Sequence, residues 1–526
     1  MQQKKLILIL NKIFTTLKVN PFILFLSIFS VIFTFYYGYI GILPIDSFLI
    51  YDAGYKVLNG FYPFKDYWSI TGPILDYIQF FFFKMLGVSW FSYVLHSATI
   101  NLILTIISFN FFTSFGLNKF NSFIYSLSIS ILAYPSIGTP FMDHHAVIFS
   151  FISLLFLILG LKTNKNIYWF FVPIFLLGSF LSKQIPSAYL LIIFLIFIFI
   201  NKVILDPKNN RYFIGLTLGS FLSIFLFLFI FIINDISLTN FVTQYLLYPL
   251  EIGNERGENI FFDIKTLFLQ FKFIYISLIP LFFILIKLAK NNKNIDKKKD
   301  LIIIILIILS ILLFIFSQIM TKNQILIFLL IPFCLGISNY YLGKYYNKKF
   351  LLNALIVVLV FATIKFHLRF NENKKFMELN GIDLSIAVDA GQLDKSLKGL
   401  KWISIEYPRN PIKELKLLEF AKEKISLDTS NKIIMSDYQI LPSIIGLKTA
   451  SPNKWFDILS VPSQKNEYFL NYKEFFLKRL IVQKIDTIYV LGEKEFFLEN
   501  ILKDKCYSKE DIKQNFKKFL IKNCFN

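Results

Sequence analysis

Long apolar runs recur through the first 366 residues of this 526-residue chain, and they limit its folds more than any other feature. A helix needs about 20 consecutive apolar residues to cross the hydrocarbon core of a bilayer. Mean hydropathy is +0.60, and 56% of the residues are hydrophobic, against about 45–50% in soluble domains. We therefore expect a polytopic α-helical membrane protein with about eleven spans. The expected spans are residues 21–42, 77–113, 120–137, 146–161, 167–182, 185–201, 212–233, 266–288, 301–320, 325–343 and 350–366.

The run at 77–113 is too long for a single span. Residues 77–87 can instead form an interfacial helix that ends at Gly87, with the true span beginning at Trp90. The first span has no small-residue cleavage site after it, so we expect it to remain in place as a signal anchor.

Lysine and arginine are concentrated in alternate short loops between the apolar runs. Cytoplasmic loops carry such an excess, which predicts a cytoplasmic N-terminus. With an odd number of spans, the chain after Phe366 is then extracytoplasmic, and the protein is expected in the inner or plasma membrane. This distribution also explains the formal net charge of +21 without a nucleic-acid partner.

Residues 1–366 are expected to form one transmembrane domain, and residues 367–526 a smaller α/β domain. Apolar runs after residue 366 shorten to strand length, and stretches with helical spacing lie between them. Such alternation predicts a mainly parallel sheet. The expected strands are 401–407, 431–440 and 485–492, and the expected helices are 411–425 and 467–484.

The three cysteines give little information about the compartment. Cys334 lies inside an expected span and is interpreted as a small apolar filler. Cys506 and Cys524 flank an expected helix near the C-terminus. In an oxidising compartment they can pair, and otherwise they are two separate thiols.

The unusual polar residues of the membrane domain fall on one expected face. They lie in four segments: 43–75, 138–145, the Lys183-Gln184 turn and 234–265. The opposite face has basic loops and little else. Any chemistry is therefore expected on the outer face.

Segment 43–75 carries three carboxylates, Asp46, Asp52 and Asp66. Asp46 directly follows the first span and is the candidate catalytic carboxylate, with Asp52 and Asp66 in supporting positions. A simpler interpretation is that Asp46 caps the amphipathic helix after it.

The segment Asp143-His144-His145 stands at the outer end of a span. Asp143 is the second candidate catalytic acid, and His145 is a supporting residue. Carboxylate and imidazole together suit a divalent ion, so Asp46, Asp143 and His144 are the candidate ligands of Mn²⁺ or Mg²⁺, ahead of Zn²⁺. The alternative is a capping aspartate with two interfacial histidines.

Two cations on the same face are candidates for binding a donor phosphate. Lys183 lies at the end of a short hairpin between two spans, and Arg256 is the only arginine of the outer loops. Arginine suits phosphate oxygens because its planar guanidinium donates two parallel hydrogen bonds. The alternatives are a lysine that snorkels to the interface and a solvated arginine on a mobile loop.

The first outer loop also has an ordered pattern of residues. The pattern consists of Asp46, Tyr51, Ala53, Leu58, Asn59, Gly60, Tyr62, Pro63, Asp66, Gly72, Pro73 and Leu75. It resembles the opening of the GT-C glycosyltransferases, and within them the dolichyl-phosphate-mannose protein mannosyltransferases and the bacterial lipid A aminoarabinose transferases. The match is close over this loop, and hydropathy extends it across residues 1–366.

The resemblance implies an inverting glycosyltransferase that uses a polyprenyl-phosphate sugar on the outer face of the membrane. The acceptor would be a lipid, a glycan or a protein. The family's two loop acids correspond to Asp46 and Asp143, and Lys183 and Arg256 match the phosphate-binding positions by location only. The chain departs from the family at Ser47, where a second acid is usual.

Two other functions are consistent with the hydropathy. A non-enzymatic polysaccharide exporter or flippase would place charged residues near the bilayer midplane, whereas the unusual charges here lie at one face. An O-antigen polymerase or ligase would use a large outer loop with arginine and histidine in place of the first-loop aspartate. We therefore expect a transferase.

Overall fold

The computed structural model describes residues 20–133, 138–205, 207, 210–258, 265–290, 294–321, 326–346, 348–502 and 506–522. Long helices make up its first part. They are α2 (Pro21–Gly38), α3 (Leu49–Leu58), α4 (Ile74–Leu86), α5 (Trp90–Phe115), α6 (Lys119–Leu132), α7 (Met142–Thr163), α8 (Asn166–Phe180), α9 (Ser187–Ile200), α10 (Arg211–Ile233), α11 (Leu238–Phe241), α12 (Tyr248–Glu258), α13 (Lys272–Lys290), α14 (Ile295–Met320), α15 (Leu330–Tyr345) and α16 (Lys349–His367).

The protein is a polytopic helical protein. Among the described residues, eight helices are long and apolar enough to cross a membrane. Three other expected spans correspond to shorter helices, α6, α8 and α15, of 14, 15 and 16 residues. The count of about eleven spans therefore stays a prediction.

The division of the long run at 77–113 is confirmed. Helix α4 ends at Leu86, and Gly87 follows it with φ of 82°, a left-handed conformation that glycine adopts without steric cost. Helix α5 then begins at Trp90, and the Ser89 hydroxyl caps it by accepting a hydrogen bond from the Ser92 N–H.

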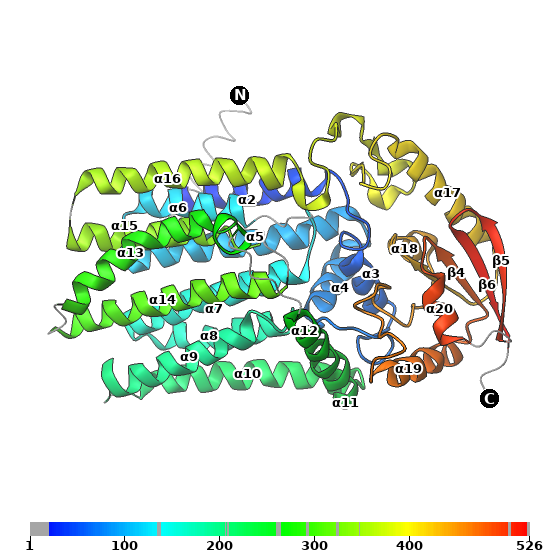
Figure 1. Cartoon of the computed structure of the whole chain (residues 1–526), viewed down its shortest axis with the longest axis horizontal. Helices are drawn as coiled ribbons and strands as arrows, with labels where there is room; N and C mark the ends of the chain where they lie inside the picture. The colour runs from blue at the N-terminus through cyan, green and yellow to red at the C-terminus, as the bar shows by residue number, and fades with distance from the viewer. Residues whose placement is uncertain are drawn as a thin grey trace, which may run out of the picture.

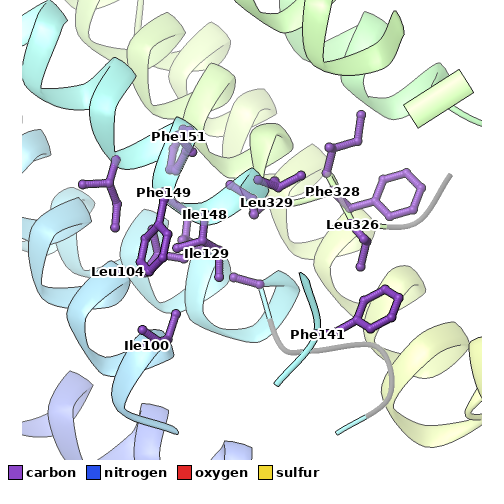
Figure 2. Packing of buried hydrophobic residues seen from close by; sticks show 14 of the residues in the cluster. Ile100, Leu104, Ile129, Phe141, Ile148, Phe149, Phe151, Leu326, Phe328 and Leu329 are labelled. Atoms are coloured by element: carbon purple, nitrogen blue, oxygen red, sulfur yellow. The ribbon is translucent and has the colours of Figure 1, made fainter. Parts of the chain in front are cut away.

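Helix α7 lies at the centre of the bundle and α10 at its edge (Figure 1). In the most apolar window of each helix, 83% of the α7 residues are buried but only 11% of those of α10. A helix that is apolar on all sides must face protein or lipid all round, so α10 is the lipid-facing one. Figure 2 shows the packing around α7, where Ile148 and Phe149 lie near Leu104 of α5 and Ile129 of α6.

The C-terminal domain sits against one end of the bundle, with α3 and α4 between them (Figure 1). Its main helices are α17 (Pro411–Leu427), α18 (Leu441–Ile445), α19 (Phe469–Val482) and α20 (Glu495–Ile501). Its strands are β1 (Val388–Asp389), β2 (Lys401–Trp402), β3 (Lys432–Ser436), β4 (Thr487–Leu491), β5 (Tyr507–Lys513) and β6 (Phe516–Ile521).

The prediction of a mainly parallel sheet is wrong, because the four-stranded sheet is mixed. Its order is β3-β4-β6-β5, with β3 and β4 parallel and the other two pairs antiparallel. The strand expected at 401–407 shrinks to the two residues of β2, which pair with β1. The helix expected between the last two cysteines is instead the hairpin of β5 and β6. Cys506 is buried, and Cys524 lies outside the described residues.

Candidate functional site

All four polar segments expected on one face come together at the end of the bundle that carries the C-terminal domain. The described part of segment 234–265 is among them, because the Ser69 N–H donates to the Gln244 side-chain oxygen at 3.1 Å and the Gln184 side chain donates to the Tyr245 carbonyl at 2.6 Å. The end of α2 approaches the segment before α7 so closely that a Cβ on Gly38 would lie 2.8 Å from the Gly138 carbonyl oxygen. The indole of Trp90 donates a hydrogen bond to the Gly38 carbonyl at 3.0 Å. These contacts hold the loop after α2 beside the start of α7.

The Gly72-Pro73 step brings the same loop against the turn after α8. A Cβ on Gly72 would lie 1.8 Å from the Leu181 carbonyl oxygen, so only glycine fits. The N–H groups of Gly72 and Ile74 donate to the carbonyls of Ser182 and Leu181, both at 3.2 Å. The motif residue Gly72 thus fixes the position of the turn that holds Lys183.

Asp143 and Lys183 form an ion pair at this end of the bundle. The Lys183 ammonium lies 2.5 Å from Oδ1 of Asp143, whose side chain is 7% exposed. Serine contacts between the two helices align the pair, because Ser150 and Ser179 hydrogen-bond at 2.7 Å and Ser179 donates to the Ala146 carbonyl. The sequence placed both residues at span ends, and the structure brings them into contact.

Asp46 lies within electrostatic range of this pair. The pKa of the Asp46 carboxyl is raised to about 7, first by burial and then by the negative charges of Asp143, Asp457 and Asp437, while Lys183 acts in the opposite direction. Ile45 has φ of 66° and donates its N–H to the Asp437 carbonyl at 2.9 Å. Contact with the C-terminal domain therefore sets the backbone at Asp46.

Asp437 and Asp457 are site residues that the sequence did not reveal. Asp437 follows β3 and lies 2.9 Å from the Lys494 ammonium, and burial raises the pKa of its carboxyl. Its place after a parallel strand was a usable signal, because ligand sites gather at the carboxyl ends of such strands. Oδ1 of Asp457 accepts the N–H groups of Leu459 and Ser460, and nothing in the sequence pattern marks it.

His144 and His145 each place one ring nitrogen against a backbone carbonyl. The His144 ring contacts the Ala133 carbonyl, and Nδ1 of His145 lies 3.0 Å from the Phe141 carbonyl. The His145 ring packs against the His96 ring, with 5.0 Å between the ring centroids. Within the described part of the chain, no three histidine, cysteine, aspartate or glutamate side chains group to hold a metal ion. The residues expected as Mn²⁺ or Mg²⁺ ligands therefore do not fit one.

Asp52 and Asp66 serve the docking of the C-terminal domain. Asp52 pairs with Lys56 at 2.8 Å, with both side chains 4% exposed. Asp66 accepts from Arg479 of α19 at 3.1 Å. Lys56, the partner of Asp52, in turn donates to the Asn453 carbonyl of the C-terminal domain at 3.0 Å. The supporting role expected for Asp52 and Asp66 in the reaction stays a prediction.

Arg256 lies in α12, but its side chain is outside the described residues. The start of α12 contacts the C-terminal domain. Tyr248 at the start of α12 donates a hydrogen bond to the Leu459 carbonyl of the C-terminal domain at 2.9 Å. The role expected for Arg256 stays a prediction.

Two apolar cavities that share lining residues lie between helices near the turn that carries Lys183. One, of about 230 Å³, is lined by α4, α8 and α10 and includes Leu181. The other, of about 370 Å³, lies between the loop after α3, α4 and α10. Both are lined by Tyr77 and Ile230. Leu181, which lines the smaller cavity, lies two residues before Lys183 in the chain.

The fold and the site define a helical membrane protein with a polar, carboxylate-rich centre where the bundle meets its C-terminal domain. In comparisons with known proteins, no protein-family model matches the chain. A search of curated proteins by sequence also returns no match. The function is therefore argued from the geometry and from the loop pattern.

Proposed function

We propose that the protein is an inverting glycosyltransferase that moves a sugar from a polyprenyl-phosphate donor to a hydroxyl acceptor. The observation that carries the proposal is the grouping of Asp46 with the Asp143–Lys183 pair, where Lys183 follows by two residues Leu181, which lines an apolar cavity. The resemblance of the loop to GT-C glycosyltransferases supports the same class. The proposed acceptor is a lipid, a glycan or a protein on the outer face.

Asp46 is the proposed general base. With a pKa of about 7, its carboxyl is ionised in a large fraction of molecules near neutral pH and is basic enough to take a proton. The acceptor oxygen attacks the anomeric carbon, its proton passes to Asp46, and the bond between the anomeric carbon and the phosphate oxygen breaks. The sugar leaves on the acceptor, and the polyprenyl phosphate is the other product.

Lys183 is the proposed partner of the phosphate that leaves. A cation aimed at developing negative charge lowers the barrier most where water is scarce. The Lys183 side chain is 22% exposed, and its ammonium contacts the Asp143 carboxylate. Asp143 thereby orients the lysine, and Arg256 is the proposed second cation.

The two cavities are the proposed seat of the lipid tail. Their linings are apolar apart from a few polar groups such as Tyr77 and Asn234. Burial of a prenyl chain is favourable by about 25 cal/mol for each Å² removed from water. A soluble nucleotide sugar would gain nothing from such a lining.

The test is sugar transfer in proteoliposomes with a panel of polyprenyl-phosphate sugars. We expect Asp46→Asn and Asp143→Asn each to lower kcat by a factor of about 100 or more, because each removes a charge needed in the transition state. Asp235→Asn is the matched control, since the Asp235 side chain at the same end of the bundle is 95% exposed. Full activity of Asp46→Asn would remove the proposed base.

A further inference from the structure

A buried ion pair that the proposed chemistry does not use joins the C-terminal domain to the bundle. Lys454 and Asp76 have fully buried side chains, and the ammonium lies 2.6 Å from Oδ1 of Asp76. Lys454 also donates to Oγ1 of Thr71 at 3.1 Å, and the Tyr67 hydroxyl donates to Oδ2 of Asp76 at 2.8 Å. Removing one partner of such a pair leaves an uncompensated buried charge, so the pair holds one geometry firmly.

The backbone around Lys454 is tied to the same loop. The Trp68 N–H donates to the Pro452 carbonyl, and the Lys454 N–H donates to the Trp68 carbonyl, each at 2.9 Å. The Lys56 ammonium donates to the Asn453 carbonyl at 3.0 Å. Segment 452–454 therefore lies on loop 67–71 like an added strand, with charged side chains fixing its register.

This loop continues into the contacts that hold Lys183. Thr71, which touches the Lys454 ammonium, directly precedes Gly72, whose N–H donates to the Ser182 carbonyl. The Gln184 side chain donates to the Ile70 carbonyl at 3.3 Å. A displacement of the loop at Thr71 must therefore move the turn that carries Lys183.

The C-terminal domain also holds the other wall of the site. The Lys401 N–H donates to the Tyr39 carbonyl at 2.8 Å, and the Ile42 N–H donates to the Ile403 carbonyl at 3.0 Å. With the Ile45 contact to Asp437, these bonds fix the chain from the end of α2 to Asp46. The same domain thus contacts the supports of both Asp46 and Lys183.

We infer that the C-terminal domain positions the two reacting groups relative to one another, and that Lys454 is a positioning residue. Lys454 fixes loop 67–74, and through it the distance from Lys183 to Asp46. The kinetic consequence of this inference rests on the proposed function, while the structural consequence does not.

The test uses the full chain in lipid nanodiscs. We expect Lys454→Met to raise hydrogen exchange at the amides of Gly72 and Ile74, because their bonds to the turn after α8 loosen. Lys517→Met is the matched control. Lys517 forms an ion pair of similar length, at 2.5 Å to Glu495, but both side chains are partly exposed and lie away from the loop. We expect no change at the two amides in this control.

The same variants are assayed for sugar transfer. We expect Lys454→Met to lower kcat by about tenfold or more with a smaller change in the KM for donor, since misplacement of a reacting group by about 1 Å costs up to about 100-fold. We expect Lys454→Arg to recover part of the loss, because it keeps the buried charge.

The outcomes separate the two proposals. Unchanged exchange and kcat in Lys454→Met, with an active wild type, overturn the positioning role. Raised exchange in Lys454→Met, together with a wild type that transfers no sugar, overturns the proposed function and leaves the positioning role intact. If Lys454→Met does not fold, Thr71→Val decides, because it removes one acceptor and keeps the ion pair. Unchanged exchange and kcat in that variant then overturn the inference.

Discussion

Asp46 has an unusual electrostatic environment because carboxylates from three separate parts of the chain act on it. Asp143 comes from the start of α7, and Asp437 and Asp457 come from the C-terminal domain. Like charges disfavour ionisation, and burial acts in the same direction. The pKa of about 7 follows from both causes, and it places the titration of Asp46, the proposed base, near neutral pH.

The pH dependence of transfer should move when one of these charges is removed. Asp457→Asn keeps an oxygen to accept the N–H groups of Leu459 and Ser460 but removes a negative charge near Asp46. The ionised form of Asp46 becomes more favourable, so its pKa falls. Because the base acts when it is ionised, the acid limb of the rate profile should move to lower pH, by roughly half a pH unit.

This shift is measured as kcat against pH for wild type and variant. Asp511→Asn, an exposed carboxylate on β5, controls for the loss of one negative charge and should leave the limb in place. A limb that moves to higher pH in Asp457→Asn would contradict the assignment of Asp46 as the titrating base.

At the residue scale, sequence position predicted one part of the site and missed another. Asp46, Asp143 and Lys183 each stand at the end of an apolar run on one expected face, and the structure brings Asp143 and Lys183 into contact. The presence of two histidines beside Asp143 suggested a metal site, but His144 and His145 each place a ring nitrogen against a backbone carbonyl inside the bundle. Asp457 was not predictable, because nothing local in a sequence encodes how a separate domain docks.

At the scale of elements, the site depends on how the loop between α2 and α4 packs on the turn between α8 and α9. Glycine at position 72 allows a backbone approach that no other residue permits. The Gly72-Pro73 step was visible in the sequence as a break between helices. Its partner at Leu181 was not, because a sequence shows that a turn exists but not what it touches.

Gly72→Ala should therefore damage the site without touching a reacting group. The added methyl would overlap the Leu181 carbonyl oxygen at 1.8 Å, so the loop or the turn must shift. We expect kcat to fall by about tenfold or more and the free energy of unfolding to fall by roughly 1–3 kcal/mol. Transfer assays and thermal unfolding in the same detergent measure both effects.

Gly343→Ala in α15 is the matched control, because an added Cβ there meets nothing within 4 Å. We expect its activity and stability to equal or slightly exceed those of the wild type. A Gly72→Ala protein with wild-type kcat would show that the approach of loop and turn does not matter for the reaction.

Secondary structure was predicted best where the local residue types are compatible with only one conformation. Gly87 and Trp90 divide α4 from α5 where the sequence indicated. The sequence predicts a helix where the hairpin of β5 and β6 lies, because the charged residues of the hairpin do not alternate regularly with apolar residues. Charged side chains such as Lys509 and Glu510 are tolerated on an edge strand and discourage pairing with other chains, so the strand period of two is blurred.

At the scale of the whole molecule, the end of the bundle away from the C-terminal domain is rich in lysine. The end away from the C-terminal domain carries exposed lysines on several helix termini, among them Lys287, Lys290, Lys298 and Lys349. The other end carries the carboxylates of the site. A positive excess marks the cytoplasmic side of a membrane protein, so the C-terminal domain and the site should face outward.

Sidedness is measured by labelling single cysteines in intact cells with a membrane-impermeant maleimide, in a chain whose own cysteines are replaced by serine. Leu470 of α19 is 73% exposed, so Leu470→Cys should react before the cells are opened. Lys298→Cys at the opposite end should react only afterwards. The reverse pattern would place the site in the cytoplasm, where soluble nucleotide sugars are present. A lipid-linked donor would then be supported by the apolar cavities alone.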